Sequence, residues 1–457
     1  MSSSNISFLL LLSFAFLTTA HTADEWKSKS IYQIITDRFA PEPDTSPRYC
    51  HDLWKYCGGT FNGITSKLQY IKSLGYDAIW ISPIPENFAD QYHGYAATNF
   101  YKINRYFGTA ADLSNLVSTA NNLGIWVMLD VVANHVSPVE NDTDFSAITP
   151  FNHASHYHPL CHVQDYSNQT EVEVCRIYNL PDLDQSNPFV RETLLDWIKN
   201  VIHYFQFSGI RIDTVPHVSA SFWKEFTTSA GVFSTGEVFN GDYSYVGHYQ
   251  NYMDSLLNYP LYFTLKNVFG KRETMWWFRL HYENMSTNFQ NLDVMVNFID
   301  NHDNPRFLFE FPCLSCYKSA LAFVFFSQGI PTGYYGSEQL YNGGQDPENR
   351  EPLWYSGYKW TEMSEFIMKL NYLRKEAELH LLEQNECFIN DSGYVFSRGK
   401  YLFAFTNSED HQVMEVFNHP FSEGQLVCNY FWNSDCVTVD EGKLTVVLER
   451  GEVKVFF

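Results

Sequence analysis

The chain has 457 residues, of which 45% are hydrophobic and 17% aromatic. It can therefore bury a large core, and it is too long for one compact domain unless that domain is a barrel with additions. Its 30 basic and 52 acidic residues give a formal net charge of -22, which argues against nucleic acid or an anionic membrane as a partner, because both require clustered Lys and Arg; a neutral substrate fits better.

The chain begins with an apolar segment, ISFLLLLSFAFLTTA (Ile6–Ala20), that is short for a membrane span and is followed by small residues suited to cleavage near Ala20 or Ala23. We predict a signal peptide over residues 1–20; a retained signal anchor is the alternative. The last residues, GEVKVFF, lack the hydrophobic tail of a lipid-anchor signal. We therefore expect a secreted, extracellular protein without a membrane anchor. Four sequons are compatible with N-glycosylation on that route: Asn141, Asn168, Asn284 and Asn390.

Nine cysteines suit an oxidising compartment, and their odd number leaves one without a partner inside the chain. Two close pairs are predicted to be disulfides that close loops: Cys50/Cys57 and Cys161/Cys175. Cys313 and Cys316 form a lone CxxC, which is a weak zinc signal and favours a small disulfide or two ordinary thiols. The pairing among Cys387, Cys428 and Cys436 stays open.

From residue 30 onward, strand and helix patterns alternate. SIYQIITDRF (Ser30–Phe39) is predicted as the first strand and AIWISPI (Ala78–Ile84) as the second, with a helical pattern over residues 64–76 between them. Leu113–Gly124 has helical spacing and a glycine stop before the strand-like WVMLDVV. This alternation points to parallel strand pairing.

Four of the predicted strands turn polar where they end. They are WVMLDVVANH (126–135), FSGIRIDTV (207–215), FSTGEV (233–238) and VNFIDNHD (296–303). Each delivers a carboxylate, an amide or an imidazole at its C-terminal end, the open rim of a parallel β/α barrel. The barrel pattern ends near residues 328–338. We therefore predict a (β/α)8 TIM barrel with an active site at that rim.

Two regions break the barrel pattern. Between His135 and about Asn187 the chain is rich in His, Asp, Asn and Pro and is far longer than an ordinary barrel loop, so we expect a small inserted domain over the rim. From about Glu383, alternating segments predict an antiparallel β-sandwich domain. The predicted domains are the barrel (21–134 and 188–382), the inserted domain after strand 3 (135–187) and the C-terminal domain (383–457).

Taken together, DVVANH, GIRIDTV, GEV and NHDNPRF resemble, in order and separation, the four signature regions of the α-amylase superfamily of retaining glycoside hydrolases. YCGGT, YHGY, LPDLD and GGQDPENRE extend the resemblance to fungal α-amylases of the Taka-amylase type over nearly the whole mature chain. The resemblance implies endo-hydrolysis of α-1,4-glucosidic bonds in starch- or glycogen-type glucans, by a protein that is expected to be a monomer.

Breaking a glycosidic bond with retention requires one carboxylate at the anomeric carbon and one protonated carboxyl at the leaving oxygen. The resemblance implies Asp213 as nucleophile, Glu237 as general acid and base, and Asp303 as the carboxylate that holds sugar hydroxyls, although a lone acidic residue is more commonly a cap or an ion-pair partner. Arg211 would keep Asp213 ionised.

The resemblance also implies residues that bind the sugar. His135 and His302 would hydrogen-bond the sugar at the cleavage point, and Tyr95 would stack on it. Asp346 and Arg350 match a pair that serves the next sugar on the non-reducing side; a surface ion pair is the alternative for these two.

A calcium site is implied as well, since Ca²⁺ prefers six to eight oxygen ligands. The matching positions are Asn134, Glu173, Asp182 and, through its main-chain carbonyl, His217. Glu171 competes with Glu173. These ligands would tie the inserted domain to the barrel rim.

The chain departs from the family pattern at three substrate-facing positions. Pro216 stands where a lysine usually donates to sugars on the leaving-group side, Ala96 where a tryptophan commonly lines the cleft, and Trp54 where a polar residue is usual. Loss of a donor and of an aromatic platform predicts altered sugar preferences. Two other functions therefore stay open: a 4-α-glucanotransferase that acts on α-glucan, of the cell wall or elsewhere, and an inactive glucan-binding homologue. The complete carboxylate set speaks against the latter.

Overall fold

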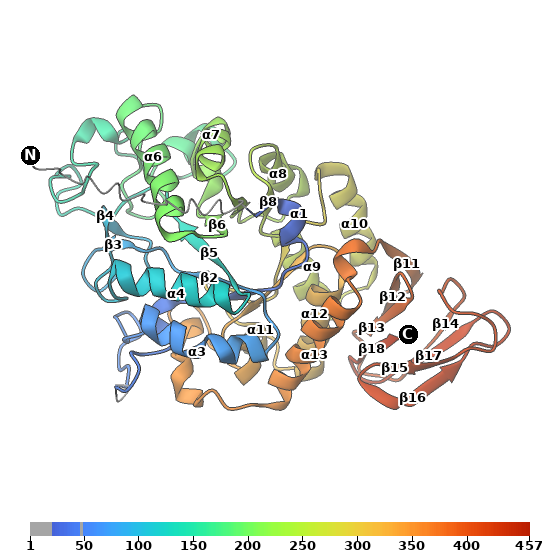
Figure 1. The fold of residues 1–457 in the computed structure, drawn as a ribbon. Coiled ribbons are helices and arrows are strands. Elements are labelled where there is room, and N and C mark those ends of the chain that lie inside the picture. Colours follow the sequence, from blue (N-terminus) through green and yellow to red (C-terminus); the bar gives the residue numbers. More distant parts are fainter. Residues whose placement is uncertain (1–20, 46–48) are drawn as a thin grey trace, which may run out of the picture.

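Eight short parallel strands form a closed barrel at the centre of the molecule (Figure 1). The computed structural model describes residues 21–45 and 49–457, so the predicted signal peptide lies outside the described residues. The strands run in the order β8-β7-β6-β5-β2-β1-β10-β9, and a bridge between Leu257 and Val296 joins β8 to β9 and closes the ring. They are β1 (Ile31–Gln33), β2 (Ala78–Ile81), β5 (Trp126–Val131), β6 (Gly209–Ile212), β7 (Phe233–Gly236), β8 (Ser255–Leu256), β9 (Val296–Asn297) and β10 (Ile330–Tyr334).

Helices cover the outside of the barrel. Their ends follow from local sequence: on α6, Pro188 is the first residue and the Asn187 side chain caps Phe189 N, whereas Gln206 ends the helix in a left-handed conformation. The α-helices are α1 (Ala23–Trp26), α2 (Thr36–Phe39), α3 (Phe61–Ser73), α4 (Ala110–Asn122), α5 (Gln169–Val174), α6 (Pro188–Phe205), α7 (Ala220–Ala230), α8 (Tyr243–His248), α9 (Tyr259–Leu265), α10 (Trp276–Asn288), α11 (Phe307–Glu310), α12 (Leu314–Phe326) and α13 (Glu362–Glu376). The predicted barrel is confirmed.

Two details of the barrel differ from the sequence-based expectation. The first strand is shorter than Ser30–Phe39, because residues from Thr36 form the helical turn α2. The buried Asp37 carboxylate holds this turn in place by accepting hydrogen bonds from Cys57 N (2.7 Å) and Gly58 N (3.0 Å). Strand β8 was not predicted, since two residues are too few to show an alternating pattern.

The segment between β5 and α6 contains no barrel strand. Residues 135–187, all of them described, hold the short helix α5, a 3-10 turn (Ala154–His156) and isolated bridges such as His135↔Asp182. A disulfide joins Cys161 to Cys175, 14 residues apart, as predicted. A hairpin of β3 (Pro85–Asn87) and β4 (Ala97–Ile103) leaves the barrel beside this segment.

The C-terminal part is an antiparallel sandwich, as predicted. A six-stranded sheet, in the order β11-β12-β13-β18-β15-β16, packs against the pair β14-β17, with Val395, Leu402, Met414 and Val446 buried between them. Its strands are β11 (Gln384–Ile389), β12 (Gly393–Arg398), β13 (Tyr401–Thr406), β14 (Gln412–Val416), β15 (Leu426–Asn429), β16 (Trp432–Thr438), β17 (Leu444–Leu448) and β18 (Val453–Phe456).

Disulfides resolve the cysteines that the sequence left open. Cys428 on β15 pairs with Cys436 on β16, Cys313 pairs with Cys316, and Cys387 is the free cysteine. The predicted Cys50–Cys57 pair is also present.

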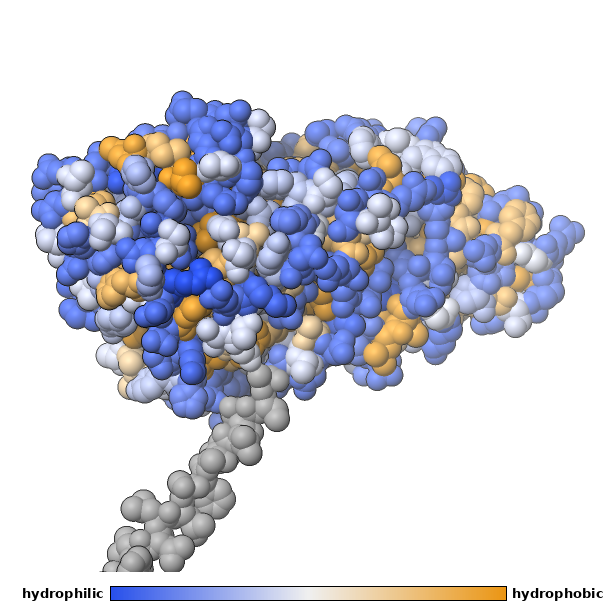
Figure 2. All heavy atoms as spheres, turned by 90° about the horizontal axis from the view of Figure 1, so that it is seen from above, coloured by the Kyte–Doolittle hydropathy of each residue, from blue (hydrophilic) through white to orange (hydrophobic). Residues whose placement is uncertain are grey.

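The surface has no extended apolar face in the view of Figure 2, where hydrophobic residues form small separate groups among hydrophilic ones. None of the helices in the described part of the chain is both long and apolar enough to cross a membrane.

Candidate active site

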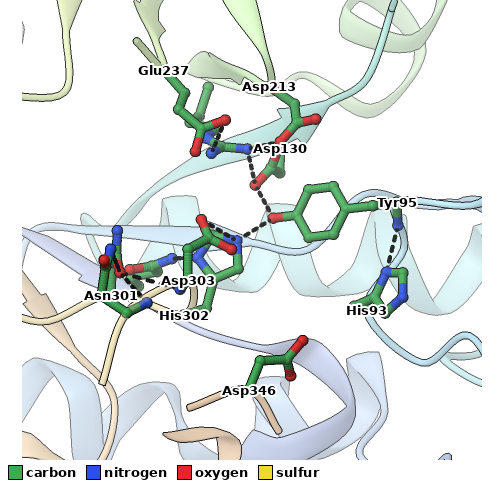
Figure 3. Close-up of polar contacts among 12 residues, drawn as sticks. His93, Tyr95, Asp130, Asp213, Glu237, Asn301, His302, Asp303 and Asp346 are labelled. Carbon is green, nitrogen blue, oxygen red and sulfur yellow. Dashed lines mark hydrogen bonds and ion pairs between the residues drawn. The ribbon is translucent and has the colours of Figure 1, made fainter. Parts of the chain in front are cut away.

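The predicted catalytic residues converge at the C-terminal ends of neighbouring strands. Asp213 follows β6 directly, Glu237 follows β7, and Asp303 lies in the loop after β9. In Figure 3 the side chains of Asp213, Glu237 and Asp303 face the same region, next to Asp130. The ladder pairs Asp130 on β5 with Arg211 on β6, so the charges of two adjacent strands meet inside the rim.

Arg211 is fully buried and serves three carboxylates. Its Nη1 donates to Asp213 Oδ1 at 2.7 Å and to Asp130 Oδ1 at 3.0 Å. Its Nη2 lies 3.0 Å from Glu237 Oε2, an ion-pair distance without hydrogen-bond geometry. One cation cannot balance three buried anions, so the cluster favours holding a proton on one carboxyl.

That proton belongs on Glu237, because burial raises its pKa further than the pKa of Asp130, which reaches about 7. Burial raises the pKa of Glu237 to about 8, with help from the charges of Asp213 and Asp303 and against the attraction of Arg211. Thr214 N, held in a left-handed backbone conformation (φ 47°), donates to Glu237 Oε2 at 3.0 Å. Asp213 instead accepts the shorter of the hydrogen bonds that Arg211 Nη1 donates. The two carboxyls thus lie in different environments: Glu237 favours its protonated form, and Asp213 is paired directly with a cation.

Tyr95 and His302 form a connected pair at the centre of the site. Tyr95 Oη donates to Asp130 Oδ2 at 2.7 Å and lies 2.7 Å from His302 Nε2. Gln33 Nε2 lies 2.7 Å from His302 Nδ1; because an amide NH₂ can only donate, Nδ1 is the acceptor and Nε2 carries the hydrogen. Burial lowers the pKa of His302 well below its usual value. The imidazole is therefore a neutral donor.

His135 is also buried, but the protein already contacts both of its ring nitrogens. Nε2 lies 3.1 Å from the Tyr95 carbonyl oxygen, and Nδ1 lies 3.2 Å from the Asn134 side chain. Burial lowers the pKa of His135. A sugar hydroxyl that contacts this ring must share or replace one of these partners.

Asp346 and Arg350 are not a surface ion pair. Arg350 is 4% exposed, and its Nη1 lies 3.1 Å from Asp346 Oδ1 while its Nη2 lies 3.5 Å from Asp303 Oδ1. Tyr92 Oη donates to Asp346 Oδ1 at 3.2 Å. Figure 3 places Asp346 apart from the Tyr95–His302 pair. The pair thus extends the polar lining away from the central carboxylates.

Three buried polar residues of the site were missed: Asp130, Gln33 and Tyr92. Asp130 accepts hydrogen bonds from Trp80, Tyr95 and Arg211. Its signal was available, because a carboxylate inside the apolar run WVMLDVV must have a buried partner. Tyr92 is the first residue of the YHGY motif, which was a signal for it as well. Gln33 carries none, since its role follows from a contact with a distant segment.

Three of the predicted calcium positions offer oxygen atoms close together. One terminal atom of the Asn134 amide lies 3.0 Å from the His217 carbonyl oxygen and 2.9 Å from Asp182 Oδ1. If this atom is the amide oxygen, it forms a group of three hard oxygens with the His217 carbonyl and the Asp182 carboxylate, which suits Ca²⁺. If it is the amide nitrogen, it donates hydrogen bonds to those two oxygens. Residues 21–45 and 49–457 contain no cluster of three His, Cys, Asp or Glu side chains able to hold a metal. The predicted calcium ligands differ from such a cluster, because they include an amide and a main-chain carbonyl.

The fourth position is on α5. Gln169 Nε2 donates to Glu173 Oε1 and to the Pro216 carbonyl oxygen, both at 2.9 Å, so Glu173 faces the turn that carries His217. The competing Glu171 instead accepts hydrogen bonds from Gln164 N and Asp165 N in the preceding loop. Glu173 is therefore better placed.

The three departures from the family pattern lie in different environments. Ala96 is 2% exposed, and Pro216 belongs to a 3-10 turn (Val215–His217). Trp54 is 64% exposed, on a loop whose Leu53 and Lys55 carbonyls accept hydrogen bonds from Arg38. Trp54 thus presents a ring to solvent from a fixed backbone.

The predicted sequons differ in accessibility. Asn141 and Asn168 are exposed, whereas Asn284, within α10, and Asn390 are half-buried. Asn284 Nδ2 donates to the Leu280 carbonyl at 2.8 Å.

Comparison with known proteins supports this description. A family model for the alpha amylase catalytic domain matches residues 33–390. An alpha-amylase of Saccharomycopsis fibuligera is 36% identical, over 95% of this chain and 92% of that protein. The solved alpha-amylase of Malbranchea cinnamomea superposes with a TM-score of 0.91 at 35% identity, covering 96% of this chain and 97% of the other. The alpha-amylase of Geobacillus thermoleovorans, solved in complex with acarbose, gives 0.85 at 31% identity, covering 94% and 98%. The chain therefore belongs to the α-amylase family.

Proposed function

We propose that the protein hydrolyses internal α-1,4-glucosidic bonds of starch- or glycogen-type glucans with retention of configuration. The observation that carries the proposal is the division between two buried carboxyls: Glu237, whose pKa is raised, and Asp213, which Arg211 pairs at 2.7 Å. The relative that was solved with acarbose supports a glucan-like ligand.

In the proposed mechanism, Asp213 attacks the anomeric carbon while Glu237 gives its proton to the leaving oxygen. Glu237, now ionised, then removes a proton from the water that releases the sugar from Asp213. Asp303, 32% exposed and beside His302 and Arg350, is suited to hold sugar hydroxyls. Tyr95 and His302 would fix the sugar at the cleavage point, with His135 beside them, and Asp346 and Arg350 would hold the next sugar.

We further propose that calcium binds to Asn134, Glu173, Asp182 and the His217 carbonyl. A bound calcium ion would supply a cross-link between the end of β5, residues 135–187 and the turn after β6. We also propose the domain boundaries given above, and a secreted, monomeric, extracellular protein that carries N-glycans; the exposed Asn141 and Asn168 are the most accessible sequons.

A glucanotransferase is the second candidate. It is favoured by Pro216, which offers no side-chain donor to the leaving-group side, and by the absence of an aromatic ring at the buried Ala96. In that case an acceptor sugar, in place of water, would release the sugar from Asp213.

Incubation of the purified protein with maltoheptaose tests both candidates, with products followed by mass and by anomeric configuration. Shorter α-configured sugars alone are the expected result. Products longer than the substrate would establish transfer, and an unchanged substrate would overturn both enzymatic functions in favour of an inactive glucan-binding protein.

A further inference from the structure

A groove lies on the flank of the barrel, away from the residues discussed above. It occupies about 700 Å³ between helix α6 and strand β4 of the hairpin that leaves the barrel. Its floor is apolar: Trp197 is buried and donates its indole N–H to the Phe100 carbonyl oxygen at 3.0 Å. None of the residues to which we assign a catalytic, sugar-binding or calcium role lines it.

One stripe of α6 forms a wall of this groove. Glu192, Asp196, Asn200 and Tyr204 all line it and are spaced four residues apart. Residues at this spacing lie on one face of a helix, roughly 6 Å apart along its axis. All four are exposed, and neither carboxylate has an ion-pair partner among the described residues. The wall therefore offers a row of polar groups whose hydrogen-bonding capacity the protein leaves open.

Aromatic rings accompany this polar row. Tyr204 is 68% exposed, Tyr101 on the opposite strand 63%, and Phe189 at the start of α6 47%. From Phe189 to Tyr204 the helix rises roughly 22 Å, which makes the wall long enough for several sugar rings. A pyranose presents an apolar face to an aromatic ring and hydroxyls at its edge to carboxylates and amides. The wall carries both kinds of partner.

The groove is close enough to the catalytic residues for one polymer chain to reach both. Tyr101 is six residues after Tyr95 in the sequence, and six residues of extended chain span at most roughly 22 Å. Tyr101 therefore lies within that distance of the tyrosine that contacts Asp130 and His302. The two carboxylates of the wall outnumber the one lysine of the lining, Lys102, which itself lies 3.9 Å from Glu86. This balance disfavours an anionic ligand, whereas a neutral glucan meets no repulsion.

We propose that this groove binds a stretch of α-glucan outside the catalytic cleft and so retains the protein on polymeric substrate. The proposal rests on the proposed function for the class of ligand. It concerns polymer binding alone, so the groove contributes nothing to the cleavage of short oligosaccharides.

The test measures polymer binding separately from catalysis. In a Glu237→Gln background, native gels that contain glycogen give a dissociation constant from the retardation of the protein, without digestion of the gel. Tyr101→Ala with Tyr204→Ala should raise this constant at least fivefold. Asn200→Trp, which fills the groove, should raise the dissociation constant as well. It replaces the alanine pair in the test if that double variant does not fold. Tyr372→Ala removes a ring of similar exposure on α13 (57%) and should leave binding unchanged.

In the active protein, the same groove variants should lower kcat/KM on glycogen and leave kcat/KM on maltoheptaose within twofold. Three results would each overturn the proposal. The first is unchanged retardation of both groove variants, and the second is a loss of kcat/KM on maltoheptaose equal to the loss on glycogen. The third is that the groove variants change retardation in gels with polylysine but not in gels with glycogen. Failure of the proposed function has a different signature, since the parent protein would then cleave neither substrate whatever the gels show.

Discussion

At the scale of single residues, the buried Arg211 pairs most closely with Asp213. Asp213→Asn removes the anion that Nη1 holds at 2.7 Å while keeping a side chain of nearly the same shape. We expect kcat on maltoheptaose to fall by at least about a thousandfold, on the scale of losing a residue that forms the covalent intermediate. Asp410→Asn, at an exposed position of the C-terminal domain, is the matched control. Full activity of the Asp213 variant would refute the proposed mechanism.

Glu237 sets the alkaline side of the activity profile. A general acid must be protonated, and burial raises the pKa of Glu237 to about 8. We therefore expect kcat/KM on maltoheptaose to persist to about pH 8 and to fall above it. A fall near pH 5, where an ordinary glutamate titrates, would show that this residue is not the acid.

The same shift makes a prediction for stability that does not depend on activity. Since the pKa is higher in the folded protein, Glu237 stabilises the fold fully below pH 4.5, and this contribution is lost as pH rises toward about 8. Glu237→Gln should therefore show a smaller decline of the melting temperature between pH 4.5 and 8 than the parent protein. Parallel curves for the two proteins would contradict the raised pKa.

At the scale of elements, structural features that depend on neighbouring residues along the chain could be predicted from the sequence. Features that depend on contacts between distant segments could not. The helical spacing of Leu113–Gly124 corresponds to α4 (Ala110–Asn122), because the spacing and the glycine that stops the helix are both local signals. For the same reason, the polar residues at the ends of β6 and β7 predicted that Asp213 and Glu237 lie at the rim of the barrel. The turn α2 was missed, since it depends on hydrogen bonds from Cys57 and Gly58, twenty residues away. The contact of Gln33 with His302 spans 269 positions and leaves no local signal.

The proposed calcium ion would join the end of β5, residues 135–187 and the turn after β6, so its removal should affect stability. A ligand at a hundredfold excess over its dissociation constant stabilises the folded state by about 2.7 kcal/mol. EDTA should therefore lower the melting temperature of the parent protein. Asn134→Ala should start from a lower melting temperature and respond little to EDTA, whereas Asn121→Ala, at an exposed position on α4, should respond as the parent does. A parent protein that is indifferent to EDTA would contradict calcium binding.

At the scale of the whole molecule, strands β12 and β13 contribute side chains both to the core of the barrel and to the core of the C-terminal sandwich. On β12, Val395 points into the sandwich, while Tyr394 and Phe396 join the core of the barrel. Strand β13 alternates in the same way, with Phe405 packing against Phe323 of α12 at a ring distance of 5.3 Å. Because each strand has one face in each core, we expect the two parts to unfold together.

Arg398 links the sandwich to the barrel through hydrogen bonds. It is 1% exposed, and from β12 it donates to the carbonyl oxygens of Phe326 (2.9 Å) and Ser327 (3.0 Å) at the C-terminal end of α12. It also donates to Leu379 and Leu382, which lie between the two parts. Burial lowers the pKa of Arg398 to about 10, so the side chain stays cationic at neutral pH and complements the helix dipole.

Arg398→Met should leave these buried carbonyls without donors at a cost of roughly 3 kcal/mol, since bonds to a charged donor are among the stronger ones. We expect a lower melting temperature in one transition, seen alike by circular dichroism and by tryptophan fluorescence, with kcat at 25 °C nearly unchanged because the catalytic rim is untouched. Arg450→Met, at an exposed turn, should melt as the parent protein does. Two separate transitions in the Arg398 variant would mean that the apolar contacts of β12 and β13 alone do not couple the barrel to the sandwich. An unchanged melting temperature would mean that Arg398 does not contribute to that coupling.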